Sequence, residues 1–359
     1  MPTMDWTFVA YSMVKIVVVF AVVMTMVAYA VLVERKVSAF IQDRVGPNRA
    51  APFFVRRIPV IGPALVRMGI FQPIADGLKA FLKEDYTPAH VRRFYFWLAP
   101  ALAVIPALLT IAVIPFGSVL GGQRMVIADL DVGILYTFGI VSLGVYGIVI
   151  AGYAANSKYP LLGGIRSSAQ MISYEISMGL SVIPVFLLVG SLNLGAVIEY
   201  QTGSLFGWLI FKQPIAFFIF LVAAFAETNR LPFDMPEAET ELVGGYHTEY
   251  SSMKFALFFM GEYAAMIAVS AMIVTLFLGG WTLPFLGLDQ PATGLFTGLL
   301  HIAIFLAKLC ALMLLIIWIR WTLPRFRYDQ LMDLGWRRAI PLALANIVVT
   351  AIVVALLHD

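Results

Sequence analysis

Eight long stretches of the chain carry almost no charge, and they constrain its fold more than any other feature. They lie at about 8–33, 94–116, 132–155, 168–190, 206–226, 253–279, 298–319 and 338–357. About 20 apolar residues in a helix cross the hydrocarbon core of a bilayer. Apolar residues make up 61% of the 359 residues and charged residues 13%, which excludes an ordinary soluble domain. The sequence therefore predicts an all-α, polytopic membrane protein with about eight transmembrane helices in a single membrane domain, 1–359.

Lysine and arginine gather in the connections that follow the odd-numbered spans. Of the 24 basic residues, 20 lie in the first, third, fifth and seventh connections. The positive-inside rule places such connections in the cytoplasm. An even number of spans then puts both termini on the outer side. The first span lacks a small-residue cleavage site before its flanking charges, so we do not interpret it as a cleaved signal.

The first connection, 34–93, is too long to be a bare link between helices. Within it, Gln72–Lys83 has an apolar face and a charged face at helical spacing, which predicts an amphipathic helix at the membrane interface. The whole connection carries a net charge of +6, whereas the fifth connection, 227–254, carries −4. Because both lie on one side of the membrane, we expect them to pack together into one polar structure.

The fifth connection contains a run of carboxylates with one nearby base, Arg230. The run consists of Glu227, Asp234, Glu237, Glu239, Glu241 and Glu249. Carboxylates this close repel one another, so their pKa values should be raised and coupled. Such a run at the mouth of membrane helices indicates a protein that handles protons or binds a cationic partner. A solvated acidic loop is the simpler alternative.

Two further carboxylates lie inside predicted spans: Glu175 in the fourth and Glu262 in the sixth. An ionised carboxylate at mid-bilayer costs about 2.5 kcal/mol or more, so each is either protonated or faces a polar cavity. The alternative is a carboxyl that only hydrogen-bonds to a neighbouring helix. Lys308, inside the seventh span, is open to snorkelling, pairing with an acid or loss of its proton.

Several charged residues surround the end of the first span. Arg35 and Arg44 are candidates to bind an anionic or carbonyl ligand, because a guanidinium stays charged and offers a planar fork of donors. Glu34 and Lys36 flank Arg35, and positive-inside flanking explains Lys36 equally well. Asp76, on the polar face of Gln72–Lys83, could pair with Lys79 one turn later.

The sequence predicts no cofactor held by this chain itself. Cys310 is the only cysteine, and the four histidines show no metal-ligand spacing. No glycine-rich nucleotide motif follows a predicted strand. We therefore expect no bound metal or flavin, and any electrons must come from a partner.

Four motifs resemble the H-subunit family of NADH–quinone oxidoreductase, which includes mitochondrial subunit 1. They lie at 34–49 (Glu-Arg-Lys, then Gln-Asp-Arg-Val-Gly-Pro-Asn-Arg), 69–85 (Gly-Ile-Phe-Gln-Pro-Ile-Ala-Asp-Gly-Leu-Lys onward), 166–175 (Arg-Ser-Ser-Ala-Gln-Met-Ile-Ser-Tyr-Glu) and 226–251. The last begins Ala-Glu-Thr-Asn-Arg-Leu-Pro-Phe-Asp-Met-Pro-Glu-Ala-Glu. The resemblance runs in order from the first span to the last. It departs from the family pattern at Arg56–Met68, which is longer than the family's connection there.

The resemblance implies the membrane subunit of respiratory complex I, with ubiquinone or menaquinone as substrate. By matching position it implies a quinone chamber that includes Glu34, Arg35, Arg44, Phe233 and Asp234. It implies a path for protons or their electrostatic coupling through Asp76, Glu175, Glu227, Glu237, Glu239, Glu241 and Glu262. NADH, FMN and iron–sulfur clusters would lie in partner subunits.

The same resemblance implies partners and a location. Peripheral-arm subunits of the quinone module would bind the cytoplasmic connections 34–93 and 227–252. Small membrane subunits and antiporter-like pumping subunits would pack beside the helices in the lipid bilayer, with no nucleic acid. The membrane would be a bacterial plasma membrane, or alternatively the mitochondrial inner membrane.

The mechanistic hypothesis is that quinone reduction shifts the coupled pKa values of Glu237, Glu239 and Glu241. Asp76, Glu175 and Glu262 would pass this change onward. One alternative is a cation/proton secondary transporter that uses Glu175 and Glu262 as an acid pair. Others are the anchor subunit of a related membrane-bound hydrogenase and a purely structural anchor.

Overall fold

The structure, a computed structural model, describes residues 6–52, 55, 61–237, 239–284 and 287–358. In these ranges seven helices are long and apolar enough to cross a membrane, and an eighth apolar helix is shorter. The strands of the described residues are two short ones, β1 (Val119–Leu120) and β2 (Gln123–Arg124), which pair antiparallel. The predicted all-α polytopic fold is therefore confirmed.

The helices follow the expected order along the chain. They are α1 (Trp6–Ile41), α3 (Ile61–Met68), α4 (Gln72–Leu82), α5 (Arg93–Thr110), α6 (Gly133–Ala154), α7 (Lys158–Val189), α8 (Leu194–Tyr200), α9 (Leu209–Lys212), α10 (Pro214–Glu227), α11 (Glu239–Leu242), α12 (Ser252–Phe277), α13 (Leu295–Thr322), α14 (Tyr328–Asp333) and α15 (Ile340–His358). Short turns at Ile111–Val113, Leu205–Gly207 and Gly245–His247 are 3-10 helices, and Leu334–Ala339 is a π-helical turn.

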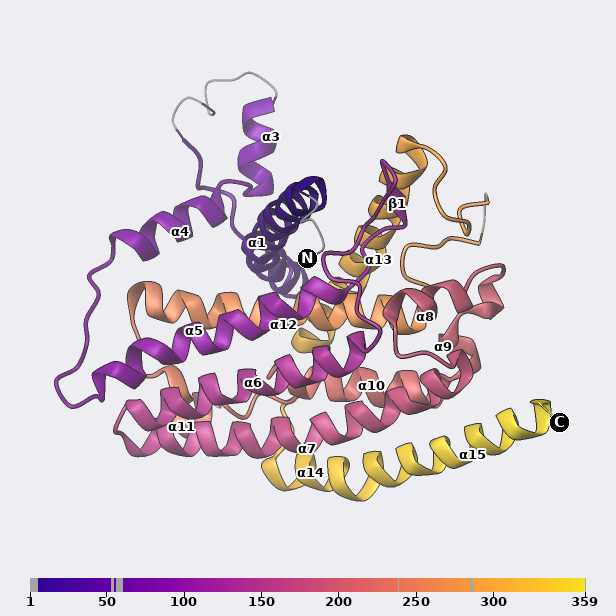
Figure 1. The fold of residues 1–359 in the computed structure, drawn as a ribbon. Coiled ribbons are helices and arrows are strands. Elements are labelled where there is room, and N and C mark those ends of the chain that lie inside the picture. Colours follow the sequence, from indigo (N-terminus) through magenta and orange to yellow (C-terminus); the bar gives the residue numbers. More distant parts are fainter. Residues whose placement is uncertain (1–5, 53–54, 56–60, 238, 285–286, 359) are drawn as a thin grey trace.

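The helices α5, α6, α7 and α10 run side by side, and α12 packs chiefly against α5, with further contacts to α10, α1 and α13 (Figure 1). Small residues allow this close packing, as is usual between membrane helices. A Cβ atom on Gly147 of α6 would lie 2.7 Å from the backbone nitrogen of Ala103 on α5. A Cβ on Gly261 of α12 would lie 3.1 Å from the Ala103 oxygen. The helix α15 lies at the edge of the bundle along α7 (Figure 1).

Contacts between helix ends place the odd-numbered connections on one side of the bundle. Arg320 at the end of α13 pairs with Glu34 near the end of α1. The Arg92 nitrogen donates to the Ala154 oxygen over 3.0 Å, which joins the start of α5 to the end of α6. On the opposite side, the Lys15 Nζ donates to the Arg124 oxygen over 2.9 Å. The basic connections therefore share one face, as their charge indicates.

The fifth crossing differs from the expected span at 206–226. The helix α10 has 14 residues, fewer than a full crossing needs. It ends at Glu227 because the Thr228 hydroxyl donates back to the Ala224 and Phe225 carbonyls, and because Asn229 has a left-handed φ of 49°. The following connection packs on the first turns of α7, where a Cβ on Gly163 would lie 2.9 Å from the Pro236 oxygen. The helix and this connection together return the chain to the basic side.

Two other helices begin or end away from the expected positions. The helix α1 continues to Ile41, so Glu34 and Arg35 lie within a helix rather than in a connection. The helix α7 starts at Lys158 and has 32 residues, so Glu175 lies near its middle rather than near its start. The charged residues at the end of α1 and at the start of α7 were expected to lie in connections. In the structure they belong to helical turns that continue the spans. Residues 56–60 of the segment Arg56–Met68 lie outside the described residues, and Ile61–Met68 forms α3.

The amphipathic helix predicted at Gln72–Lys83 is present as α4. Pro73 lies in its first turn, where a missing backbone N–H costs nothing. None of its residues is fully buried, and Leu78 and Phe81 are exposed. Figure 1 shows α4 lying beside the end of the bundle, apart from the packed helices.

Candidate functional site

A cavity of about 710 Å³ lies between α1, α4 and α12. This volume is in the range of pockets that bind small organic ligands. Its walls are mostly apolar and include Val27, Val31, Phe81, Phe259 and Met260. Its polar lining consists of Glu34, Arg35, Gln72, Asp76 and Tyr263. The cavity suits a ligand with a long apolar part and a small polar head.

Arg35 and Asp76 face each other across this cavity. The Arg35 Nη1 lies 2.7 Å from the Asp76 Oδ2, and the Gln72 amide donates to the other Asp76 oxygen over 2.9 Å. The pair joins α1 to α4. Asp76 therefore pairs with Arg35 in preference to Lys79, which the sequence left open.

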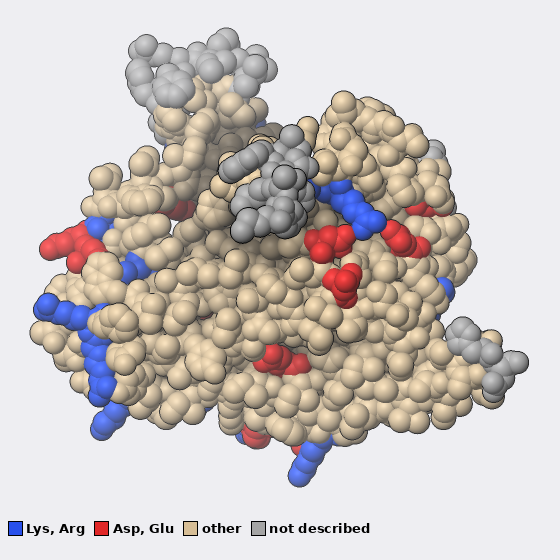
Figure 2. Space-filling model, in the orientation of Figure 1, with Lys and Arg blue, Asp and Glu red and all other residues tan. Residues whose placement is uncertain are grey.

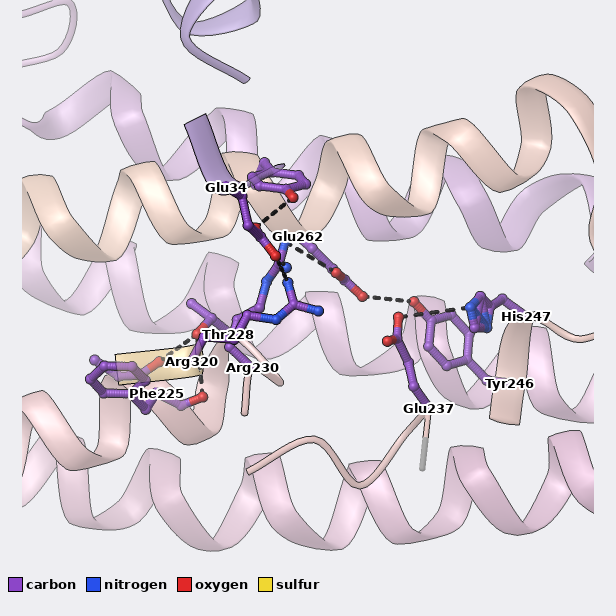
Figure 3. A network of polar contacts seen from close by, with 11 residues as sticks. Glu34, Phe225, Thr228, Arg230, Glu237, Tyr246, His247, Glu262 and Arg320 are labelled. Atoms are coloured by element: carbon purple, nitrogen blue, oxygen red, sulfur yellow. Dashed lines mark hydrogen bonds and ion pairs between the residues drawn. The ribbon is translucent and has the colours of Figure 1, made fainter. Parts of the chain in front are cut away.

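Glu34 is the buried carboxylate that closes the polar end of the cavity. It accepts a hydrogen bond from the Tyr263 hydroxyl over 2.7 Å. It also pairs with Arg320 of α13, and the Arg230 Nη1 lies 3.4 Å from its Oε2 (Figure 3). Two helices, α12 and α13, and the fifth connection thus converge on this one side chain of α1.

Arg230 links Glu34 to the next carboxylate, Glu262. Its Nη2 lies 3.4 Å from the Glu262 Oε2, and its guanidinium stacks over the Tyr263 ring at 4.3 Å (Figure 3). Only 2% of Arg230 is exposed. A charge so deeply buried requires compensation, and the two carboxylates provide it. Glu34, Arg230, Glu262, Tyr263 and Arg320 are called the arginine-centred cluster below.

Glu237 and His247 lie beyond Glu262. The Tyr246 hydroxyl donates to Glu262 over 3.2 Å, and Glu237 lies on the other side, towards His247 (Figure 3). Burial, together with the charges of Glu262 and Asp234, raises the pKa of Glu237 to about 9. Burial lowers the pKa of His247 to about 4. The Glu237 Oε1 lies 3.7 Å from the His247 Nε2, and at neutral pH this contact joins two uncharged groups.

Glu227 and Glu175 continue the row of carboxylates into the bundle. Glu227 is buried at the end of α10, and Glu175 of α7 is the charged group that acts on it electrostatically. A cavity of about 80 Å³ between α5, α6, α7 and α12 is lined by both Glu227 and Glu262. It has room for a few water molecules. Water there would connect the two carboxyls.

The structure places Phe233 and Asp234 outside the lining of the large cavity. Asp234 is buried and lies 2.8 Å from the Arg325 Nη2. Burial raises the pKa of Asp234 even though Arg325 opposes the shift. Phe233 packs edge-on against the Tyr174 ring at 5.5 Å. Both residues support the fifth connection where it meets α7 and the start of α14.

The remaining residues of the predicted site lie nearer the surface. The Glu241 side chain is 52% exposed and lies 2.6 Å from Arg166. Arg44 is exposed and donates to Gln42. Glu239 begins α11, and its side chain lies outside the described residues. Glu237 and Glu241 thus diverge, one into the protein and one towards the surface.

The first and fifth connections do meet, and their pairs run in both directions, since the His90 Nε2 of the first lies 3.9 Å from the Glu249 Oε1 of the fifth. Lys254 of the fifth lies 3.1 Å from Asp85 of the first. The arginines paired with Asp234 and Glu241 come from the seventh and third connections instead. The net charge of a whole connection did not predict these pairs, because side-chain partners depend on which helix ends are neighbours.

Four members of this network were missed from the sequence: Tyr246, His247, Tyr263 and Arg320. Tyr263 directly follows Glu262 in a span, which is the one available signal.

The role of Lys308 was left open by the sequence, and the structure places its ammonium at the end of α12. It donates to the carbonyls of Leu278, Gly280 and Thr282 at 2.7, 3.0 and 2.6 Å. No group of three potential metal ligands occurs in the described ranges.

The fold and the site define a class of protein: a polytopic membrane protein in which a large apolar cavity meets a row of buried carboxylates. Residues 14–351 match the family model described as NADH dehydrogenase, and the chain belongs to this family.

Similar curated proteins cover almost the whole chain. The second H-type subunit of NADH-quinone oxidoreductase from Koribacter versatilis is 48% identical over 368 residues, covering 97% of this chain and 98% of the relative. The H-type subunit from Flavobacterium johnsoniae is 46% identical over 361 residues, covering 99% and 98%. NADH-quinone oxidoreductase subunit 8 of Rhodothermus marinus is 50% identical over 333 residues, covering 91% and 92%. The resemblance found in the sequence motifs is confirmed.

Proposed function

We propose that the chain forms the quinone chamber of a proton-pumping NADH–quinone oxidoreductase and transmits the effect of quinone reduction into the membrane. The names of the relatives support the enzyme complex. The observation that carries the rest is the continuity from the large cavity to the buried carboxylates. Glu34 both lines the cavity and contacts Arg230, which contacts Glu262.

The cavity suits a quinone because its two ends differ. The apolar wall from α1, α4 and α12 would hold the isoprenoid tail of ubiquinone or menaquinone. Arg35 and Tyr263 would be the donors nearest the carbonyl oxygens of the head group, because their side chains line the polar end. Phe233, Asp234 and Arg44 would act from the edge of the chamber or through a partner.

Quinone reduction would be coupled to proton movement by electrostatic interactions between neighbouring side chains, not by the movement of a single group. Electrons that enter the cavity add negative charge beside Glu34, which weakens the hold of Arg230 on its two carboxylates. Glu262, less strongly paired with Arg230, can then accept the proton that Glu237 holds at neutral pH. Glu227 and Glu175 would carry the change further into the bundle. Asp76, Glu239 and Glu241 would form the part of the path nearest the aqueous side.

The side that carries the basic connections would face the cytoplasm of a bacterium, with both termini on the outer side of the plasma membrane. Peripheral-arm subunits would bind there, through 34–93 and 227–252, and would hold NADH, FMN and the iron–sulfur clusters. Figure 2 shows a broad face of the protein with few charged side chains, as expected for contact with lipid or with other membrane subunits.

Filling the cavity tests this proposal. Ala256 lines the cavity on α12, whereas Ala75 lies exposed on α4 outside the lining. We expect Ala256→Trp to lower NADH:quinone reductase activity of the purified complex at least tenfold, without changing NADH oxidation by a water-soluble artificial acceptor. Ala75→Trp is the matched control and should change neither rate. Wild-type quinone reductase activity in Ala256→Trp would exclude this cavity as the chamber.

A further inference from the structure

The helix α4 forms one wall of the large cavity, yet it has little packing that could fix its position. Pro73, Gly77 and Ala80 of α4 line the cavity, but none of its residues is fully buried. Leu82, at its end, is 84% exposed. A helix without a buried face depends on specific contacts at its ends to stay in place.

The first turn of α12 supplies such contacts at the end of α4. The Ser252 hydroxyl lies 3.0 Å from both the Ala80 and the Lys83 carbonyl oxygens and can donate to either. Ala80 lies in the last turn of α4, where backbone acceptors have no partner within the helix, and Lys83 is the residue directly after that helix. Ser252 has a φ of 54°, a left-handed conformation that is unfavourable for serine. The fold keeps a strained residue where its hydroxyl reaches α4.

Lys254 holds the segment that follows α4. Its Nζ lies 3.1 Å from the Asp85 Oδ2 and 2.8 Å from the Thr87 hydroxyl, and it stacks over the Trp97 ring at 3.8 Å. Only 5% of Lys254 is exposed. At the other end of α4, the Arg35–Asp76 pair joins it to α1. Arg35 and Asp76 are partly exposed, so the more deeply buried charge that holds this region is Lys254.

We infer that Ser252 and Lys254 are positioning residues that set the width of the quinone chamber by fixing α4 against α12. This inference rests on the proposed function. Neither residue lines the cavity, so neither touches the quinone. They act through α4, whose displacement would loosen the wall formed by Pro73, Gly77 and Ala80. The quinone would bind less tightly, whereas electron delivery from the partner subunits would not change.

The test uses the double variant Ser252→Gly/Lys254→Met in the purified complex. Glycine accepts the left-handed backbone and removes only the hydroxyl, and methionine removes the charge at similar length. We expect KM for a long-tailed quinone to rise at least fivefold, with kcat changed less than twofold and with artificial-acceptor activity unchanged. Backbone amides of 72–83 should also exchange hydrogen at least tenfold faster. Lys158→Met, the same change at an exposed lysine on α7, is the control and should alter neither.

Three results would overturn the inference: an unchanged KM, exchange in 72–83 equal to that of the wild type, or a parallel loss of artificial-acceptor activity. The last would show that the two residues serve assembly instead. The proposed function has an independent test, because it predicts loss of quinone reduction in Ala256→Trp whether or not α4 moves. If Ala256→Trp blocks the chamber but the double variant has no effect, the proposed function stands and the positioning role of Ser252 and Lys254 is refuted.

Discussion

Replacing Glu237 by glutamine should change how stability depends on pH. Burial and neighbouring carboxylates raise the pKa of Glu237 to about 9 from an ordinary value of 4.5. The folded protein therefore holds a proton that the unfolded chain releases above pH 4.5. The stability that this carboxyl confers is full below pH 4.5 and is lost progressively as the pH rises to about 9.

The magnitude follows from the linkage between proton binding and stability. One proton held only by the folded state makes the free energy of unfolding fall by about 1.4 kcal/mol per pH unit. Because Glu262 and Asp234 share the titration, we expect about half of this, roughly 0.7 kcal/mol per pH unit. Glutamine carries no titratable proton and resembles the protonated acid, so Glu237→Gln should remove this part of the slope.

The assay is thermal dissociation of the chain from the purified complex, followed on native gels between pH 6 and pH 9. The midpoint of the wild type should fall more steeply with pH than that of Glu237→Gln. The difference should correspond to roughly 2 kcal/mol over the range. Glu241→Gln is the control, because the Glu241 side chain is 52% exposed and should leave the slope unchanged. Parallel curves for the wild type and Glu237→Gln would show that Glu237 is ionised at neutral pH and that its pKa is not raised in the folded protein.

Two further changes test the arginine-centred cluster and the end of α12. Arg230→Met leaves Glu34 and Glu262 without their shared partner; such a loss costs roughly 3–5 kcal/mol and should lower the dissociation midpoint sharply. Adding Glu262→Gln should restore part of that stability, and a double variant less stable than Arg230→Met would contradict the pairing. Lys308→Met removes three hydrogen bonds to carbonyls after α12 and should cost roughly 2–4 kcal/mol in the same assay. An unchanged midpoint would show that Lys308 does not stabilise this helix end.

The sequence predicted most of the fold because long apolar runs are the strongest signal that a chain contains. It also located α4, since the two faces of that helix differ clearly in polarity. It did not predict that α10 would begin only at Pro214, because a hydropathy pattern carries no information about the break at Gln213 that separates α9 from α10. Nor did it predict that Glu34 lies inside a helix, because charges normally mark the end of a span.

The site was predicted as a set of residue types but not as an arrangement. The motifs singled out Glu34 and Glu237, and the charge inside a predicted span singled out Glu262; the structure brings all three into one network. The motifs gave no role to Arg230 beyond its place as a lone base. Partners such as Arg320 come from helices far apart in sequence, so only packing shows that their charges meet. The difference between Glu237, whose side chain is 14% exposed, and the exposed Glu241 likewise depends on how the fifth connection turns against α7.

Photolabelling with an azidoquinone is the most direct test of the central claim, that the cavity between α1, α4 and α12 is the quinone chamber. The purified complex would be illuminated with the labelled quinone, with and without an excess of unmodified quinone, and the modified peptides sequenced. We expect competed label within 24–35, 72–81 and 253–263, the segments that line the cavity. Competed label confined to other segments of this chain, or to a partner subunit alone, would contradict it.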